Sequence, residues 1–193
     1  MTGHDGRAGT FDRLFDGDPD PWNFAHSEYE RAKREASIAA LPRACYGTAL
    51  EVGCATGYLT AMLAPLCDRL VALDTSHTAL QLASDRLKPF AGVQLVRADV
   101  PADWPAGAFD LVVLSEVLYF LGAEEIADVA RLACGALAQD GHCLLVNWTG
   151  QSNLPLTGDE VVDLFERSAS WQVLHRQRAE NYRLDLFASN ARP

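Results

Sequence analysis

Short apolar segments alternate with helix-like segments along most of this chain, and this alternation restricts the fold more than any other feature. The expected strands cover residues 49–52, 70–73, 93–96, 111–114 and 143–147, and helical patterns cover residues 58–67, 78–87 and 124–137. Near-continuous apolar strands separated by helices are typical of a parallel sheet that is covered on both faces. The sequence therefore predicts an α/β fold with a doubly wound, Rossmann-like sheet.

The segments on either side of this core complete the predicted organisation. Residues 1–20 are rich in Gly, Asp and Pro and are expected to form a flexible N-terminal arm. Residues 21–193 are expected to form one domain, with a lid helix within 21–48, a ligand-binding core at 49–148 and a tail at 149–193. The lid helix covers residues 27–41 and ends at Pro42, and the tail holds a helix at 157–167 and strands at 171–175 and 183–188.

The charge balance of the 193 residues argues against two classes of partner. The formal net charge is −10, so the chain lacks the basic footprint that nucleic acids and anionic membranes require. No apolar run reaches transmembrane length, and the polar start carries no signal peptide. The five cysteines show no C-x-x-C spacing, which indicates reduced thiols, a cytoplasmic protein and no metal site. We expect a monomer or a homodimer that acts on a small molecule.

Residues 50–57, LEVGCATG, form a small-residue loop at the end of the first expected strand, where open α/β sheets bind ligands. The loop lacks the lysine and spacing of a P-loop. Its small residues Gly53, Ala55 and Gly57 are spaced two and two, which differs from the dinucleotide fingerprint. Glu51 adds negative charge that is unfavourable beside a pyrophosphate and favourable beside an ammonium or sulfonium. The loop therefore favours S-adenosylmethionine over a dinucleotide such as NAD.

Acidic residues end four consecutive expected strands, namely Glu51, Asp74, Asp99 and Glu116. Asp74 lies about 20 residues past the loop, where an acid holds ribose hydroxyls, and Asp99 is placed to contact the amino edge of an adenine. Any one of these acids alone is equally explained as a solvated helix N-cap, whereas the set of four indicates a binding edge. The predicted cofactor contacts in the core are Glu51, Gly53, Cys54, Ala55, Gly57, Asp74, Thr75, Asp99, Val100 and Ser115.

These motifs resemble those of the class I S-adenosylmethionine-dependent methyltransferases. EVGCATG is similar to their glycine-rich motif, with Ala55 at the position of its middle glycine. The resemblance covers residues 49 to about 147. It implies a seven-stranded sheet whose last strand is antiparallel, with the tail supplying the final strands.

Four further segments resemble the nodulation protein S family: residues 20–42 (DPWNFAHSEYERAKREASIAALP), 109–121 (FDLVVLSEVLYFL), 141–148 (GHCLLVNW) and 155–165 (PLTGDEVVDLF). This resemblance implies N-methylation of the amine of a deacetylated chitooligosaccharide or a related aminosugar. Similar sequences often carry a histidine before the tryptophan of the fifth strand. Asn147 takes that position here, which leaves the acceptor open.

Methylation of an amine gives specific roles to residues at this edge. An amine must be neutral when it attacks, so Glu116 is the candidate for orienting an ammonium and taking its proton, or else for contacting the cofactor. Tyr29 and Lys33 lie four residues apart on one face of the lid helix. Tyr29 is expected to stack near the cofactor and Lys33 to meet its methionine carboxylate; the alternatives are a packed aromatic ring and a solvated lysine.

Aromatic residues near the site are candidates for acceptor binding, because sugars pack well on aromatic faces. These candidates are Trp22, Tyr119 and Trp148, and each is equally well explained as a core aromatic. Asn153, Asp159 and Asp185 are candidates for binding hydroxyls of a polar acceptor, although no spacing argument raises them above surface residues. His26 is the histidine closest to the expected mouth of the site, although a lone histidine is usually structural. O- or S-methylation, an NAD-dependent oxidoreductase and a catalytically silent cofactor-binding partner protein remain alternatives.

Overall fold

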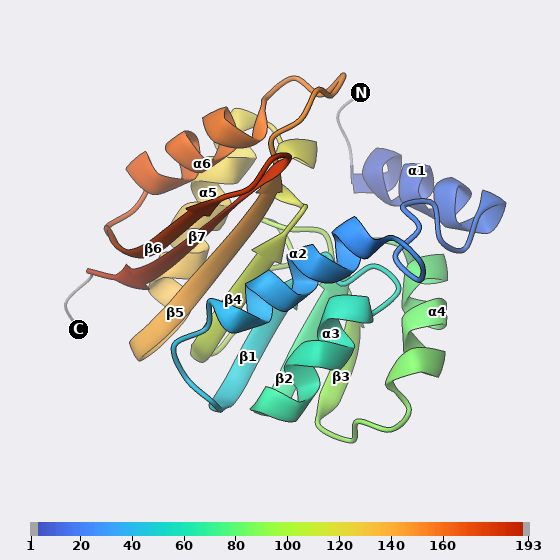
Figure 1. Cartoon of the computed structure of the whole chain (residues 1–193), viewed down its shortest axis with the longest axis horizontal. Coiled ribbons are helices and arrows are strands. Elements are labelled where there is room, and N and C mark those ends of the chain that lie inside the picture. The colour runs from blue at the N-terminus through green and yellow to red at the C-terminus, as the bar shows by residue number, and fades with distance from the viewer. Residues whose placement is uncertain (1–3, 191–193) are drawn as a thin grey trace.

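A seven-stranded sheet organises residues 4–190, the part of the chain described by the structure, which is a computed structural model (Figure 1). The strand order is β3-β2-β1-β4-β5-β7-β6. The pairs β1–β2, β1–β4, β2–β3 and β4–β5 are parallel, whereas β7 is antiparallel to both β5 and β6. The strands are β1 (Tyr46–Val52), β2 (Cys67–Asp74), β3 (Val93–Arg97), β4 (Phe109–Ser115), β5 (Leu137–Trp148), β6 (Trp171–Arg178) and β7 (Tyr182–Ser189).

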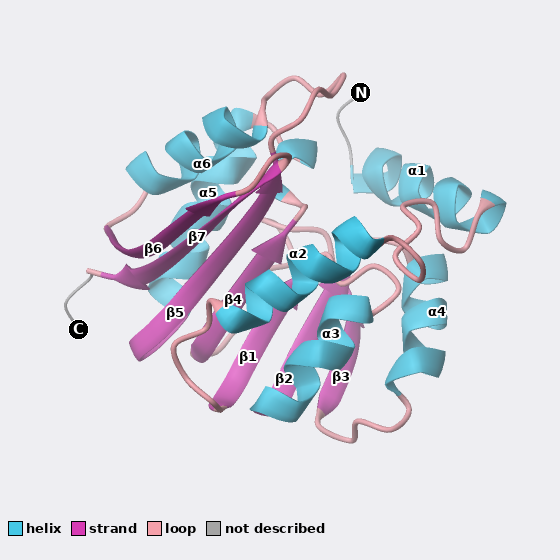
Figure 2. Ribbon diagram, viewed as in Figure 1, coloured by secondary structure: helices cyan, strands magenta, loops and turns pink. Residues whose placement is uncertain are grey.

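Helices cover both faces of the sheet (Figure 2). One face carries α2 (Glu28–Ala39), α3 (Tyr58–Leu63) and α4 (His77–Leu87), and the other carries α5 (Ala123–Ala136) and α6 (Gly158–Arg167). The 3-10 turns η1 (Ala64–Leu66) and η2 (Leu118–Phe120) follow α3 and β4, and α1 (His4–Gly17) packs against α4. No helix in residues 4–190 is both long and apolar enough to cross a membrane.

The central strands are apolar on both sides, and this explains why they lie in the middle of the sheet. Leu50 and Val52 pack with the helices α5 and α6, whereas Ala49 packs with Leu59 and Leu63 of α3. Burial of each of these leucine and valine side chains stabilises the fold by about 1.5–3 kcal/mol. Residue pairing across β2, β1 and β4 brings the carboxyl ends of these three strands to one edge.

The predicted α/β sheet is confirmed, including the antiparallel last strand, and the differences concern element ends. The helix expected at residues 58–67 ends at Leu63, because Pro65 lies in the 3-10 turn that follows and lacks the N–H that a helix interior needs. Strand β2 begins earlier than expected, at Cys67, and β5 begins at Leu137.

The expectation of a flexible arm over residues 1–20 differs from the structure, which has helix α1 over most of this segment. Ala8 and Phe15 are buried, and the ring of Phe11 packs edge-on against Phe120 at a centroid distance of 5.0 Å. These apolar contacts, together with ion pairs to the sheet edge, order a segment whose composition alone indicates flexibility. Residues 1–3 lie outside the described residues.

Candidate functional site

The glycine-rich loop forms a tight turn after β1. Gly53, Ala55 and Gly57 all have positive φ, at 75°, 48° and 81°. The N–H groups of Gly53 and Cys54 both donate to the carbonyl of Leu73 at 2.8 Å, which ties the loop to the end of β2. A Cβ at Gly53 would lie 2.2 Å from Cγ2 of Val117, so only glycine fits both the backbone and the space.

Asp74 fastens this loop to the start of α4. Its Oδ2 accepts a hydrogen bond from the N–H of Ala55 and its Oδ1 accepts one from the N–H of Ser76, both at 2.8 Å. Burial raises the pKa of the Asp74 carboxyl to about 6, although these hydrogen bonds act in the opposite direction. Asp74 therefore braces the loop, and its predicted contact with ribose hydroxyls stays a prediction.

Glu51 lies beneath the loop, with only 2% of its surface exposed. Its Oε2 has no hydrogen-bond partner among residues 4–190. Burial raises the pKa of Glu51 to about 7; the nearby hydroxyl of Thr60 acts in the opposite direction, and the negative charge of Asp74 raises this pKa further. A buried carboxylate with an unused oxygen gains most from a cation, so this part of the site fits a ligand that carries an ammonium or sulfonium.

Helix α1 reaches across the carboxyl edge of the sheet, a contact that the sequence did not predict. Arg7 places Nη1 3.2 Å from Oδ1 of Asp99 and Nη2 2.6 Å from Oε1 of Glu125. Asp12 of the same helix accepts a hydrogen bond from the hydroxyl of Ser76 at 2.7 Å. Helix α1 therefore bridges three segments at the edge where the loop lies, and Asp99 is held by an arginine in this arrangement.

Glu116 is the charged centre of the second half of the site. It follows β4, with φ at 60°, and its Oε1 accepts a hydrogen bond from Nζ of Lys33 at 3.0 Å. Its Oε2 accepts one from the backbone N–H of Trp148 at 3.2 Å and a short one from the hydroxyl of Tyr119. Lys33 also contacts Glu30 at 2.9 Å. The carboxylate thus joins the lid helix α2 to the ends of β4 and β5.

The structure places Lys33 differently from the sequence prediction. Its side chain is buried and its ammonium is paired with two carboxylates, so it is not a solvated lysine; its contact with a methionine carboxylate stays a prediction. The Tyr29 ring lies beside it, with Nζ of Lys33 5.2 Å from the ring centroid. Tyr29 also packs edge-on against Trp148 at 5.7 Å, and burial raises the pKa of its phenol. The lid helix therefore closes on the fifth strand through these contacts.

The predicted aromatic platform is only partly assembled. Tyr119 and Trp148 both contact Glu116, so they lie on the same side of the site. The ring of Trp22 packs edge-on against Phe15 at 5.5 Å, and 39% of its surface is exposed. The prediction that Trp22 joins an acceptor platform stays a prediction.

Two of the acidic residues considered for acceptor hydroxyls form ion pairs with arginines. Asp185 is buried and accepts hydrogen bonds from Arg176 and Arg183 at 2.8–3.1 Å. Asp159 accepts a pair of hydrogen bonds from Arg178 at 2.6–2.7 Å, in a bidentate arrangement. Both carboxylates therefore fasten the β6–β7 hairpin and the start of α6.

Asn147 is fully buried near the end of β5, and neither polar atom of its side chain has a partner among the described residues. Its burial beneath Gly158, whose Cβ would lie 3.4 Å from that of Asn147, is not visible from the spacing of residues. Asn153 lies on an exposed loop.

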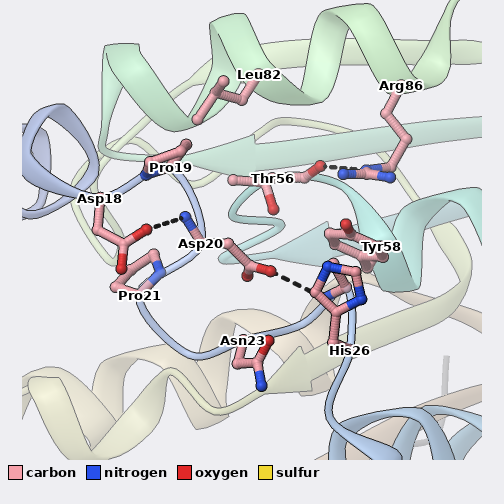
Figure 3. A pocket seen from close by; sticks show the side chains of 11 residues that line it. Asp18, Pro19, Asp20, Pro21, Asn23, His26, Thr56, Tyr58, Leu82 and Arg86 are labelled. Carbon is pink, nitrogen blue, oxygen red and sulfur yellow. Dashed lines mark hydrogen bonds between the residues drawn. The ribbon is translucent and has the colours of Figure 1, made fainter.

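A pocket of about 610 Å³ opens between the glycine-rich loop, helix α4 and the segment that links α1 to α2 (Figure 3). His26, considered near the mouth of the site, lines it. The sequence did not predict this pocket, because its walls come from three distant parts of the chain. Its other lining residues are Asp18, Pro19, Asp20, Pro21, Asn23, Ala25, Thr56, Tyr58, Leu82 and Arg86.

Comparison of the sequence with family models gives a match to the model of nodulation protein S over residues 6–150. The chain is 39% identical to a nodulation protein S of Rhizobium tropici over 129 residues, which is 64% of this chain and 52% of the relative. It is 38% identical to that of Bradyrhizobium diazoefficiens over 104 residues, which is 53% of this chain and 49% of the relative. The chain therefore spans about half the length of these relatives.

Two solved structures extend the comparison to the fold. A putative methyltransferase from Pseudomonas syringae has a TM-score of 0.74 and 38% identity, covering 83% of this chain and 99% of its own. The N-methyltransferase NodS from Bradyrhizobium japonicum WM9, in complex with S-adenosyl-L-homocysteine, has a TM-score of 0.84 and 23% identity, covering 95% of this chain and 98% of its own. The second likeness concerns the fold, which is that of the class I methyltransferases.

Proposed function

The chain belongs to the nodulation protein S family, and from this premise we propose that it is an S-adenosylmethionine-dependent N-methyltransferase. The proposed acceptor is the amine of an aminosugar or of a compound that resembles a deacetylated chitooligosaccharide. One observation carries the proposal: the neighbouring strands β1 and β4 bring the carboxylates of Glu51 and Glu116 to the same edge. This edge suits a cationic cofactor beside a cationic acceptor.

The loop residues supply the cofactor half of the proposed site. Gly53 allows the backbone to approach a ligand closely, and Asp74 holds the loop in place through the N–H of Ala55. Glu51 offers its unused oxygen to a positively charged group. When bound, S-adenosylmethionine supplies a methyl group that its sulfonium already activates. The chain therefore has to position the reactants and exclude water.

Glu116 supplies the acid–base chemistry in this proposal. Its carboxylate attracts the ammonium of the acceptor and takes one proton, which leaves a neutral nitrogen able to attack. Tyr119 and the backbone N–H of Trp148 hold the carboxylate in place. Lys33, on the lid helix, balances its charge until an acceptor arrives. Helices α1 and α2 shield the edge from water, since both contact it.

The proposed function is tested by incubating the protein with S-adenosylmethionine and a partly deacetylated chitooligosaccharide. We expect mass spectrometry to detect one added methyl group, located on the free amine by fragmentation. The matched control is the fully N-acetylated oligosaccharide of the same length, which has the same hydroxyls but no free amine and is expected to stay unmodified. Equal methylation of both compounds would identify an O-methyltransferase instead. Cofactor binding without transfer to any amine would favour a catalytically silent protein.

A further inference from the structure

Two arginines stack on Tyr58 beside the pocket of Figure 3. Cζ of Arg86 lies 3.4 Å from the centroid of the Tyr58 ring, and Cζ of Arg34 lies 5.2 Å from it. Nε of Arg86 donates to the carbonyl of Thr56 at 2.9 Å, which fixes the guanidinium plane and leaves its two terminal nitrogens for another partner. Among residues 4–190, neither arginine forms an ion pair with a carboxylate.

Buried polar atoms without partners occur at the same place. Thr56 is 2% exposed, and its hydroxyl has no hydrogen-bond partner among the described residues. Figure 3 shows this hydroxyl pointing into the pocket, between Asp20 and Tyr58. Nη1 of Arg34, which does not line the pocket, is also buried without a partner among the described residues. Such groups are costly unless a ligand or water satisfies them, so the Thr56 side of the pocket offers one unused hydroxyl.

The acidic residues of the pocket accept hydrogen bonds from backbone N–H groups of the same chain. Asp20 accepts hydrogen bonds from the N–H of Phe24 at 2.7 Å and from that of Ala25 at 2.9 Å. Asp18 accepts one from the N–H of Asp20 at 2.9 Å. These bonds shape the segment between α1 and α2. Among the described residues neither carboxylate forms a direct ion pair with Arg34 or Arg86, although the charge of Asp20 acts on Arg34 through space. The negative charge of the two carboxylates opposes the binding of an anion, so the proposed ligand contacts the side of the pocket that carries Arg86 and Thr56.

We propose that this pocket binds the carboxylate or phosphate group of a small molecule other than the cofactor. The planar fork of Arg86 is suited to bidentate contact with such an oxyanion, and the hydroxyl of Thr56 supplies a further donor. None of the predicted cofactor contacts of the core lines the pocket, and Glu116 does not line it. The pocket borders the proposed methyl-transfer site through Thr56 of the glycine-rich loop, and we infer that it is a second binding site because none of the predicted cofactor contacts lines it.

The experiment is a calorimetric titration of the full chain with inorganic phosphate and, separately, with acetate. Binding of at least one anion is expected. Arg86→Gln is expected to weaken binding at least about tenfold, because it removes the charged fork, and Arg86→Lys is expected to retain part of it. Thr56→Val is expected to weaken binding several-fold, whereas Thr56→Ser keeps the hydroxyl and stays near wild type. Arg69→Gln is the matched control, since Arg69 is exposed and contacts only Gln94 among the described residues.

The same titration, repeated in the presence of S-adenosylhomocysteine, tests the anion pocket and the proposed methyltransferase function separately. In protein saturated with S-adenosylhomocysteine, the phosphate affinity is expected to be unchanged. Loss of phosphate binding under S-adenosylhomocysteine but not under methylthioadenosine, which lacks the amino-acid part, would identify the pocket as the cofactor's own carboxylate site and overturn the proposal. Equal affinity in wild type and Arg86→Gln, or no binding of either anion, would also overturn it. A chain that binds anions but not S-adenosylhomocysteine would support the pocket and contradict the proposed function.

Discussion

Replacement of Glu116 by glutamine is expected to lower turnover by about 100-fold or more, the range found for loss of a general acid or base. Glutamine keeps an oxygen that can accept from Tyr119 or from the N–H of Trp148, so the local geometry is retained. The glutamine amide, however, cannot take a proton from the ammonium of the acceptor. Lys33 keeps its pairing with Glu30, which holds the lid helix in place. The measurement is kcat with an amine acceptor, together with the Kd of S-adenosylhomocysteine.

Cofactor affinity separates the two roles that Glu116 can have. If it acts on the acceptor, the Kd of S-adenosylhomocysteine is expected to change by no more than about twofold, because the interaction lost is made only during transfer. Glu124→Gln is the matched control, since Glu124 is exposed in the first turn of α5. Equal losses of turnover and of cofactor affinity would mean that Glu116 is a cofactor contact without acid–base work.

Replacement of Gly53 by alanine is expected to cost about 2–4 kcal/mol of unfolding free energy and most of the cofactor affinity. The backbone at Gly53 has a φ of 75°, which alanine adopts only with strain. The new Cβ would also lie 2.2 Å from Cγ2 of Val117, so the segment after β4 has to shift. Denaturant unfolding and calorimetry with S-adenosylhomocysteine measure the two effects.

A second substitution separates the two causes of the lost stability, which are the backbone strain at residue 53 and the steric overlap of the new Cβ with Val117. In the double variant Gly53→Ala/Val117→Ala the crowding is removed, and part of the stability is expected to return, whereas the backbone strain stays. Gly135→Ala is the control: Gly135 lies within α5 with open space around it, so alanine is expected to be neutral or to stabilise the helix. Unchanged stability and cofactor affinity in Gly53→Ala would contradict the described loop geometry.

The fold was largely predictable because its signals are local. Apolar runs such as 111–114 identify buried strands without any long-range information, and Ser27 marks the start of α2, where its side chain accepts from the N–H of Glu30 at 3.2 Å. The ends of elements were less predictable. Pairing partners extend β5 back to Leu137, a position with no strand signal of its own.

Helix α1 was missed because its composition obscures its pattern. Three glycines and several aspartates lie in residues 4–17, and these are typical of a flexible arm. Ala8, Phe11 and Phe15 nevertheless recur at intervals of three and four residues, which is the spacing of one helix face. This spacing was the feature of the sequence from which helix α1 could have been predicted. The contacts that use it, on α4 and Phe120, exist only in the folded chain.

The acidic residues of the candidate site could be predicted from the sequence, whereas the basic residues that pair with them could not. The acids end strands, and the ends of parallel strands meet at one edge by the rules of the fold. Lys33 lies 83 residues from Glu116 in the sequence, and their ion pair depends on how the lid helix lies across the sheet. The same holds for Arg7 and Asp99, and for the stack of Arg34, Tyr58 and Arg86.

Calorimetric titration with S-adenosylhomocysteine tests the central claim most directly, with NAD as the control ligand and Asp74→Ala as the second sample. We expect S-adenosylhomocysteine to bind the wild-type chain and NAD not to bind. In Asp74→Ala the affinity is expected to fall at least about 30-fold, since hydrogen bonds to a charged group contribute about 1.5–3 kcal/mol each. Binding of NAD in place of S-adenosylhomocysteine, or of neither ligand, would contradict the assignment of residues 50–57 as the loop of a methyltransferase.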